Sequence, residues 1–208
     1  MQTITKTAIA AAALFAAVSA YAVPIEASYS ISANQDGNNG LIIETTDVAP
    51  NPFSFELGAS AHTFSLFKIW TPETDVGPDD RDPQPISVTF NFTSPDFVNG
   101  GSVDGETVGT SSWFLFINYQ EGQVTWESNA TEFTFGPNGD GKFEISLSNE
   151  DFNGGLWGLH EGKKGGAEVF ATFRLISDAT AAVPEPATLA LFGLGLAGLG
   201  VARRRAAA

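Results

Sequence analysis

The sequence predicts an all-β protein, an antiparallel two-sheet β-sandwich or jelly roll. First, apolar residues alternate with polar ones with a period of two, most clearly at 25–31 and 86–92, as in strands with one buried face. Second, the chain is only 16% charged and rich in glycine (22) and phenylalanine (17), a composition of strands and turns. Third, no stretch of the central region keeps a 3.6-residue apolar period.

About ten segments of this kind follow one another, separated by turn-forming sequences. We expect strands at 25–32, 41–46, 52–57, 63–70, 86–93, 112–119, 123–127, 132–135, 142–148 and 168–176. Turns rich in Gly and Asn are expected at 36–40, 99–101, 120–122 and 137–141. Residues 71–85 contain four prolines and five acidic residues, which predicts a long surface loop.

The first 22 residues have the order of a secretory signal peptide. Lys6 supplies a positive start, 8–18 is apolar, and Ala20 and Ala22 form an A-x-A cleavage site. A buried N-terminal helix or a membrane anchor is the alternative, but the apolar run is short for a span. We therefore expect export by the Sec machinery and cleavage by signal peptidase, with Val23 as the mature N-terminus.

The other end carries Pro184, Glu185 and Pro186, an apolar stretch at 187–202, and then three arginines. Sixteen helical residues span about 24 Å, slightly less than the roughly 30 Å of a hydrocarbon core. A short transmembrane helix is therefore expected here. The positive-inside rule keeps the basic cluster cytoplasmic and places the preceding domain outside. That topology signal consists of Arg203, Arg204 and Arg205.

This order of motif, apolar helix and arginine cluster resembles the PEP-CTERM sorting signal over about residues 183–205. The resemblance implies an exosortase as partner, with Pro184, Glu185 and Pro186 as its recognition residues and cleavage nearby. It also implies transient anchoring in the membrane, a final place at the cell surface or outside the cell, and an association with exopolysaccharide and biofilm. The expected division is a signal peptide at 1–22, a β-sandwich at 23–178, a linker at 179–183 and the sorting signal at 184–205.

The region between the two ends is strongly acidic. Between Val23 and Pro184 the chain has six basic and 23 acidic residues, which gives a net charge of −17. Such a field disfavours nucleic acid and anionic lipid as partners and favours cations. The chain has no cysteine, so disulfides, thiolate catalysis and cysteine zinc sites are excluded.

Calcium is the one cofactor that the acidic loops suggest. Hard cations take several oxygen ligands from flexible loops, and four aspartates gather within eight positions of the proline-rich segment. No complete twelve-residue calcium loop is present, so solvated acidic turns are the alternative. The candidate ligands are Asp75, Asp79, Asp80 and Asp82.

Aromatic residues are the candidates for binding a sugar. Trp157 lies among Gly154, Gly155 and Gly158, which predicts an exposed loop position. A stacking platform with other aromatic residues would suit carbohydrate, whereas aromatic residues on strands otherwise fill the core. The other candidates are Trp113, Tyr119 and Trp126, the two tryptophans on neighbouring expected strands.

Catalytic candidates are few, and we expect a protein that is not an enzyme. His62 and His160 lie in no metal-binding or nucleophile motif. Paired carboxylates could support glycoside hydrolysis, but glutamates on strands also serve solubility. A carbohydrate-binding module, with or without calcium, and a glycan-active jelly-roll enzyme are the alternatives. The carboxylates concerned are Glu121, Glu127, Glu132 and Glu144.

Overall fold

The fold is seen in a computed structural model, which describes residues 22–37, 39–96 and 98–180. Within these residues the fold is all-β apart from one 3-10 turn, η1 (Asp79–Arg81). The eleven strands are β1 (Val23–Ser32), β2 (Glu44–Asp47), β3 (Phe53–Leu57), β4 (His62–Trp70), β5 (Gln84–Ser94), β6 (Gly101–Phe114), β7 (Ile117–Trp126), β8 (Thr131–Phe135), β9 (Gly141–Leu147), β10 (Glu150–Leu156) and β11 (Ala167–Ser177).

The strands form two antiparallel sheets that pack face to face. One sheet has six strands in the order β10-β7-β6-β5-β1-β3, and the other has five in the order β2-β4-β11-β9-β8. The structure therefore confirms an antiparallel all-β fold of two sheets, with eleven strands in the described residues.

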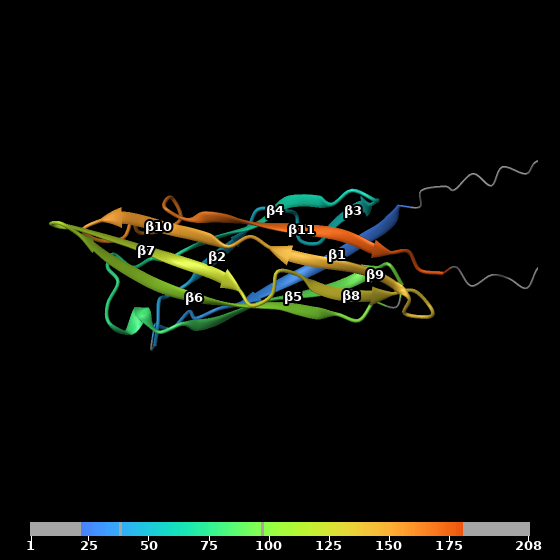
Figure 1. The fold of residues 1–208 in the computed structure, drawn as a ribbon, viewed down its shortest axis with the longest axis horizontal. Coiled ribbons are helices and arrows are strands. Elements are labelled where there is room, and N and C mark those ends of the chain that lie inside the picture. Colours follow the sequence, from blue (N-terminus) through green and yellow to red (C-terminus); the bar gives the residue numbers. More distant parts are fainter. Residues whose placement is uncertain (1–21, 38, 97, 181–208) are drawn as a thin grey trace, which may run out of the picture.

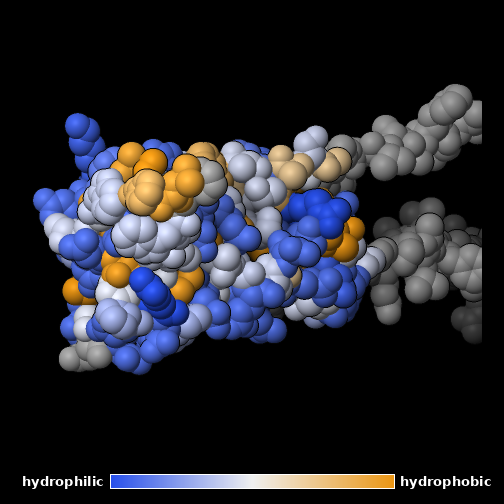
Figure 2. All heavy atoms as spheres, turned by 60° about the vertical axis from the view of Figure 1, so that its left-hand side comes forward, coloured by the Kyte–Doolittle hydropathy of each residue, from blue (hydrophilic) through white to orange (hydrophobic). Residues whose placement is uncertain are grey.

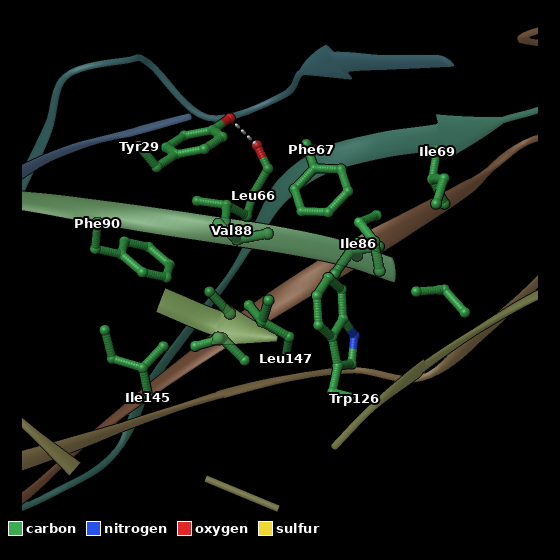
Figure 3. Packing of buried hydrophobic residues seen from close by; sticks show 14 of the residues in the cluster. Tyr29, Leu66, Phe67, Ile69, Ile86, Val88, Phe90, Trp126, Ile145 and Leu147 are labelled. Atoms are coloured by element: carbon green, nitrogen blue, oxygen red, sulfur yellow. Dashed lines mark hydrogen bonds between the residues drawn. The ribbon is translucent and has the colours of Figure 1, made fainter. Parts of the chain in front are cut away.

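Apolar side chains from both sheets fill the space between them, among them Phe67 of β4 and Phe90 of β5 (Figure 3). Phe173 of β11 packs against Phe90 of β5 with ring centroids 6.0 Å apart and against Phe53 of β3 at 5.9 Å. Tyr29 brings a hydroxyl into this core, and the single hydrogen of this group is shared between Leu66 O and Asp47 Oδ1, each 2.8 Å from the hydroxyl oxygen. The alternating pattern thus buries one face of each sheet against the other.

One hairpin differs from the sequence prediction. A turn was expected at 120–122 between short strands, but β6 and β7 run through as long strands and the turn is Leu115-Phe116. Gly109 and Gly122 instead lie opposite each other in mid-ladder. Aromatic side chains explain the glycine at 122, because Phe152 of β10 occupies the space that a Cβ there would need.

Two further segments also correct the prediction. β10 was not expected, because Asp151, Asn153 and two glycines are poor strand formers. The segment 71–83 is a loop as expected, yet it is not wholly on the surface: Val76 and Asp80 are buried. Both pack against Gly109, so the loop covers part of the inner face of β6.

Both ends of the described chain lie at the same end of the elongated sandwich (Figure 1). β1 begins and β11 ends there, whereas the β6–β7 turn lies at the opposite end. The predicted signal peptide up to Tyr21, the sorting motif and the apolar stretch 187–202 fall outside the described residues. Within residues 22–37, 39–96 and 98–180, no helix is long and apolar enough to cross a membrane.

Candidate functional site

Large apolar side chains are exposed together around the β6–β7 turn. On the side that Figure 2 turns forward, an orange patch with pale neighbours stands out from a mainly hydrophilic surface. Because contiguous apolar surface is costly in water, such a patch marks an interaction site. Its members are Trp113, Leu115, Phe116, Ile117, Tyr119, Leu156 and Trp157.

Trp113 and Trp157 form the centre of a surface that we call the ledge, together with Ser111 and Asn118. The two indole rings meet edge to face, with centroids 5.7 Å apart and planes at 84°. Each tryptophan is 66% or 62% exposed. Ser111 Oγ donates to Asn118 Oδ1 at 2.9 Å, which orients polar groups beside the rings.

Strand geometry explains why Trp113 faces solvent. Inward positions alternate along β6, and the residues from Val103 to Gly109 at these positions are buried. Trp113 lies on the same face of β6, but it is exposed because the side chains that cover the positions up to Gly109 do not extend over it. Val76 donates its N–H to Gln120 Oε1 at 2.7 Å, so the 71–83 loop covers the neighbouring row. The ledge is thus the uncovered end of a core-facing surface.

Trp157 is placed by a chain reversal after β10. Its N–H donates to Asn118 O at 2.7 Å, and Leu159 N–H donates to Thr74 O at 2.7 Å. Trp157 itself has a φ of 62°, a left-handed conformation that is unfavourable for a bulky residue. Backbone strain of this kind is characteristic of binding sites and other functional positions.

Asn153 is the residue that holds this reversal together, and sequence reasoning missed it. It is fully buried, with Oδ1 accepting from Thr71 N–H at 2.9 Å and Nδ2 donating to Gly162 O at 3.0 Å and to His160 O. Its side chain therefore joins β10, the glycine-rich segment and the loop after β4. Its one signal in the sequence is an Asn followed by two glycines, a combination that tolerates a positive φ.

The turn that ends the hairpin carries the two most exposed apolar side chains of the patch, Leu115 (79%) and Phe116 (84%). Two-residue hairpin turns favour Gly, Asn or Asp, because at least one residue needs a positive φ. Here Leu115 takes that place with a φ of 57°. The chain thus has an apolar side chain at a position where local stability favours glycine, and departures of this kind from local rules are expected at functional sites.

The other predicted aromatic residues divide between core and surface. Trp126 is 8% exposed and donates its Nε1–H to Ser148 O at 3.0 Å, so it belongs to the core. Tyr119 is half-exposed on β7, with its pKa raised by burial and by Glu121. The exposed position predicted for Trp157 is confirmed.

Three of the four aspartates proposed for calcium, Asp75, Asp79 and Asp80, border one surface depression. Asp80 is buried and accepts the N–H of Gly77 at 2.6 Å, so its carboxylate stabilises the loop itself. Glu73 also borders the depression that Asp75, Asp79 and Asp80 line, whereas Asp82 is not part of its lining. Across the described part of the chain, no three acidic or histidine side chains are grouped as metal ligands. Calcium binding stays a prediction.

The glutamates considered for glycoside hydrolysis do not share a cleft. Glu132 and Glu144 are register partners on β8 and β9 and form ion pairs with Lys142 and Arg174. Glu121 belongs to the other sheet, on β7, and accepts from Gln123 Nε2 at 3.1 Å. His62 stacks on Phe55, with ring centroids 4.1 Å apart, and His160 lies in the reversal that Asn153 organises.

Comparison with known families identifies the C-terminal segment. A family model described as the PEP-CTERM protein-sorting motif matches residues 182–205. The tail is a PEP-CTERM sorting motif. This PEP-CTERM protein is therefore exported, is held transiently in the membrane by its tail, and has an exosortase as its processing partner.

The match stops at the tail and leaves the β-sandwich without a relative. No curated protein and no solved structure matches the chain. What the β-sandwich does must therefore be argued from its own surface.

Proposed function

We propose that this PEP-CTERM protein is a non-enzymatic component of the cell surface or extracellular matrix and that its ledge binds exopolysaccharide. The observation that carries the proposal is the solvent-exposed pair Trp113 and Trp157. Indole rings supply flat apolar area that packs on the C–H faces of sugar rings. Polar groups of Ser111 and Asn118 lie beside them to meet hydroxyl groups.

The position of the ledge supports the same function. The described chain leaves the sandwich toward its sorting tail at one end, and the ledge lies at the other (Figure 1). While the tail holds the protein in the membrane, a ledge at the far end is the part most able to reach a surrounding polymer. After processing, the same surface would retain the released protein in the matrix.

Affinity electrophoresis of the exported protein through gels containing exopolysaccharide from the same cells tests this function. Trp113→Ala and Trp157→Ala should each weaken binding roughly tenfold, the loss of about one stacking contact. Phe170→Ala is the matched control, because Phe170 is an exposed aromatic residue on β11 of the other sheet. Equal retardation of all four proteins, in the presence and absence of calcium, would refute the proposal.

Processing has its own test. Mass spectrometry of the released protein should find Val23 as the N-terminus and no peptide from 189–205. Replacing Pro184, Glu185 and Pro186 with alanine should keep the tail attached and the protein in the membrane fraction. Release of this variant at the normal rate would show that sorting does not depend on the motif.

A further inference from the structure

A second apolar feature lies at the open side of the sandwich, where the two sheets end differently. β3 is the last strand of its sheet, and β2 pairs with β4 only from Phe67 to Trp70. The first half of β4 therefore has no β2 partner, and a cavity of about 400 Å³ opens between it and β3. We call this cavity the slot, lined by Ala49, Pro50, Pro52, Phe53, Ser54, Phe55, His62, Phe64 and Ser65.

Aromatic rings form the walls of the slot. Phe53 and Phe64 meet edge to face at 5.2 Å, and Phe55 stacks against His62 at 4.1 Å. Within the described chain, the buried hydroxyl of Ser65 has no hydrogen-bond partner. An apolar cavity of this size with one unpaired polar group fits a large side chain together with part of its backbone.

The turn at the other end of the molecule presents two large apolar side chains, which an apolar slot can accept. Leu115 and Phe116 project from the hairpin with about four-fifths of their surface exposed. They differ from the ledge in position, because Trp113 lies on the core-facing side of β6 whereas Leu115 and Phe116 form the turn beyond both strands. Sugar binding by the ledge therefore leaves this turn unexplained.

Charge limits which surfaces of two copies can meet. Between Val23 and Pro184 each copy carries a net charge of −17, so most approaches between processed copies are repulsive. The turn and the slot both come from stretches without Asp, Glu, Lys or Arg: residues 107–120 for the turn, and 48–55 and 57–67 for the slot. These two uncharged apolar surfaces can touch with little repulsion.

We infer that copies of this protein assemble head to tail, with the Leu115-Phe116 turn of one copy inserted in the slot of the next. The slot lies toward the end where β1 begins, since β3 pairs with Val23–Ala27, and the turn lies at the opposite end (Figure 1). A pair of copies joined in this way therefore keeps one free turn and one free slot. Such a heterologous contact does not close on itself in a dimer but extends into chains or rings.

Sedimentation velocity of the exported, processed protein measures this assembly. Its average mass should rise with concentration up to about 1 mM, the weak end of specific association. Leu115→Gly with Phe116→Ser removes the inserted group, and Ser54→Glu places a charge at the rim of the slot. Each variant alone should sediment as a monomer, with association weakened at least tenfold. Ser30→Glu, an exposed serine on β1, adds the same charge outside the slot and should assemble like the unaltered protein.

Mixing the two defective variants gives the sharpest result. The turn variant still has an intact slot, and the slot variant still has an intact turn. An equimolar mixture should therefore form a one-to-one dimer and nothing larger. A mixture that stays monomeric overturns the proposal, as does assembly of either variant on its own. A two-fold dimer of the unaltered protein that does not grow with concentration also overturns it.

Salt distinguishes this contact from ionic association. Salt screens the repulsion between acidic copies while leaving apolar burial intact. Assembly should therefore strengthen between about 20 mM and 500 mM NaCl, because the Debye length falls from about 20 Å to about 4 Å over this range. Weaker assembly at high salt would overturn the proposed apolar contact. Exopolysaccharide binding by the monomeric turn variant keeps this result separate from the function of the ledge.

Discussion

Trp113 and Trp126 lie on the same face of the same hairpin, yet one is 66% exposed and the other 8%. Trp126 is the register partner of Gly105, and Trp113 lies four inward positions further along β6. Only the neighbours differ. Beneath Trp126 the second sheet supplies packing and Ser148 O a hydrogen bond, whereas the hairpin passes beyond that sheet at Trp113. One repeating pattern thus builds core at one end and exposed aromatic surface at the other.

The exposed aromatic surface at the hairpin end does not need a cleft. Extending two strands beyond the opposite sheet exposes residues that would otherwise be core. Exposed aromatic residues contribute little to the stability of the fold, which comes instead from aromatic packing between the two sheets in the covered region. Substitutions at the covered end should therefore change the free energy of unfolding, whereas substitutions at the uncovered end should change binding.

The largest expected effect is at the covered end. Trp126→Ala should lower the free energy of unfolding by about 3–5 kcal/mol, because it leaves a cavity and removes a hydrogen bond. Trp113→Ala should change it by no more than about 0.5 kcal/mol, as a surface substitution. Urea titrations of the exported protein measure both. Similar losses in the two variants would remove the distinction between the regions.

The next effect concerns Asn153, which joins the two regions. Asn153→Ala should cost about 2–3 kcal/mol, since the buried N–H of Thr71 and the carbonyl of Gly162 lose their partner. Hydrogen exchange should also become faster in residues 158–165. Asn153→Gly separates the contribution of the side-chain hydrogen bonds from that of the backbone conformation, because glycine tolerates the φ of 54° but makes no side-chain bond. Full stability of the glycine variant would show that the side-chain bonds contribute nothing.

Tyr29 tests the covered region by pH. Burial, with hydrogen bonding to Asp47 and its charge, raises the pKa of Tyr29 well above its usual range. The folded state therefore favours the neutral phenol. Its contribution is complete below the unfolded pKa of about 10 and is lost as the pH rises further. Tyr29→Phe should cost about 1 kcal/mol at pH 7 and reduce the fall in stability above about pH 10. An unchanged pH profile would contradict this assignment.

The smallest effect has the opposite sign and lies at the uncovered end. Leu115→Gly should raise the free energy of unfolding by up to about 1 kcal/mol, because glycine adopts the positive φ without a steric penalty. Thermal unfolding measures the gain, and Ile117→Gly, at a strand position of the same hairpin, should destabilise instead. A less stable Leu115→Gly protein would mean that leucine contributes to folding rather than to contact.

Sequence reasoning succeeded where the signal is local. Alternation located most strands of both sheets, and the glycines around Trp157 indicated its exposure. It failed at the hairpin, where the polar Gln120-Glu121-Gly122 was interpreted as a turn and Leu115-Phe116 as strand interior. Local turn chemistry is overridden there because β10 pairs along β7 and Phe152 needs the space above Gly122.

By itself the sequence determined the all-β class and the sorting tail, since periodicity and a contiguous motif are both properties of neighbouring residues. Only the tertiary structure decided which aromatic residues are surface and which are core. Alternation assigns Trp113 and Trp126 to one face, but burial depends on how far the opposite sheet and the 71–83 loop extend. That extent is fixed by strands distant in sequence, and so is the slot between β3 and β4.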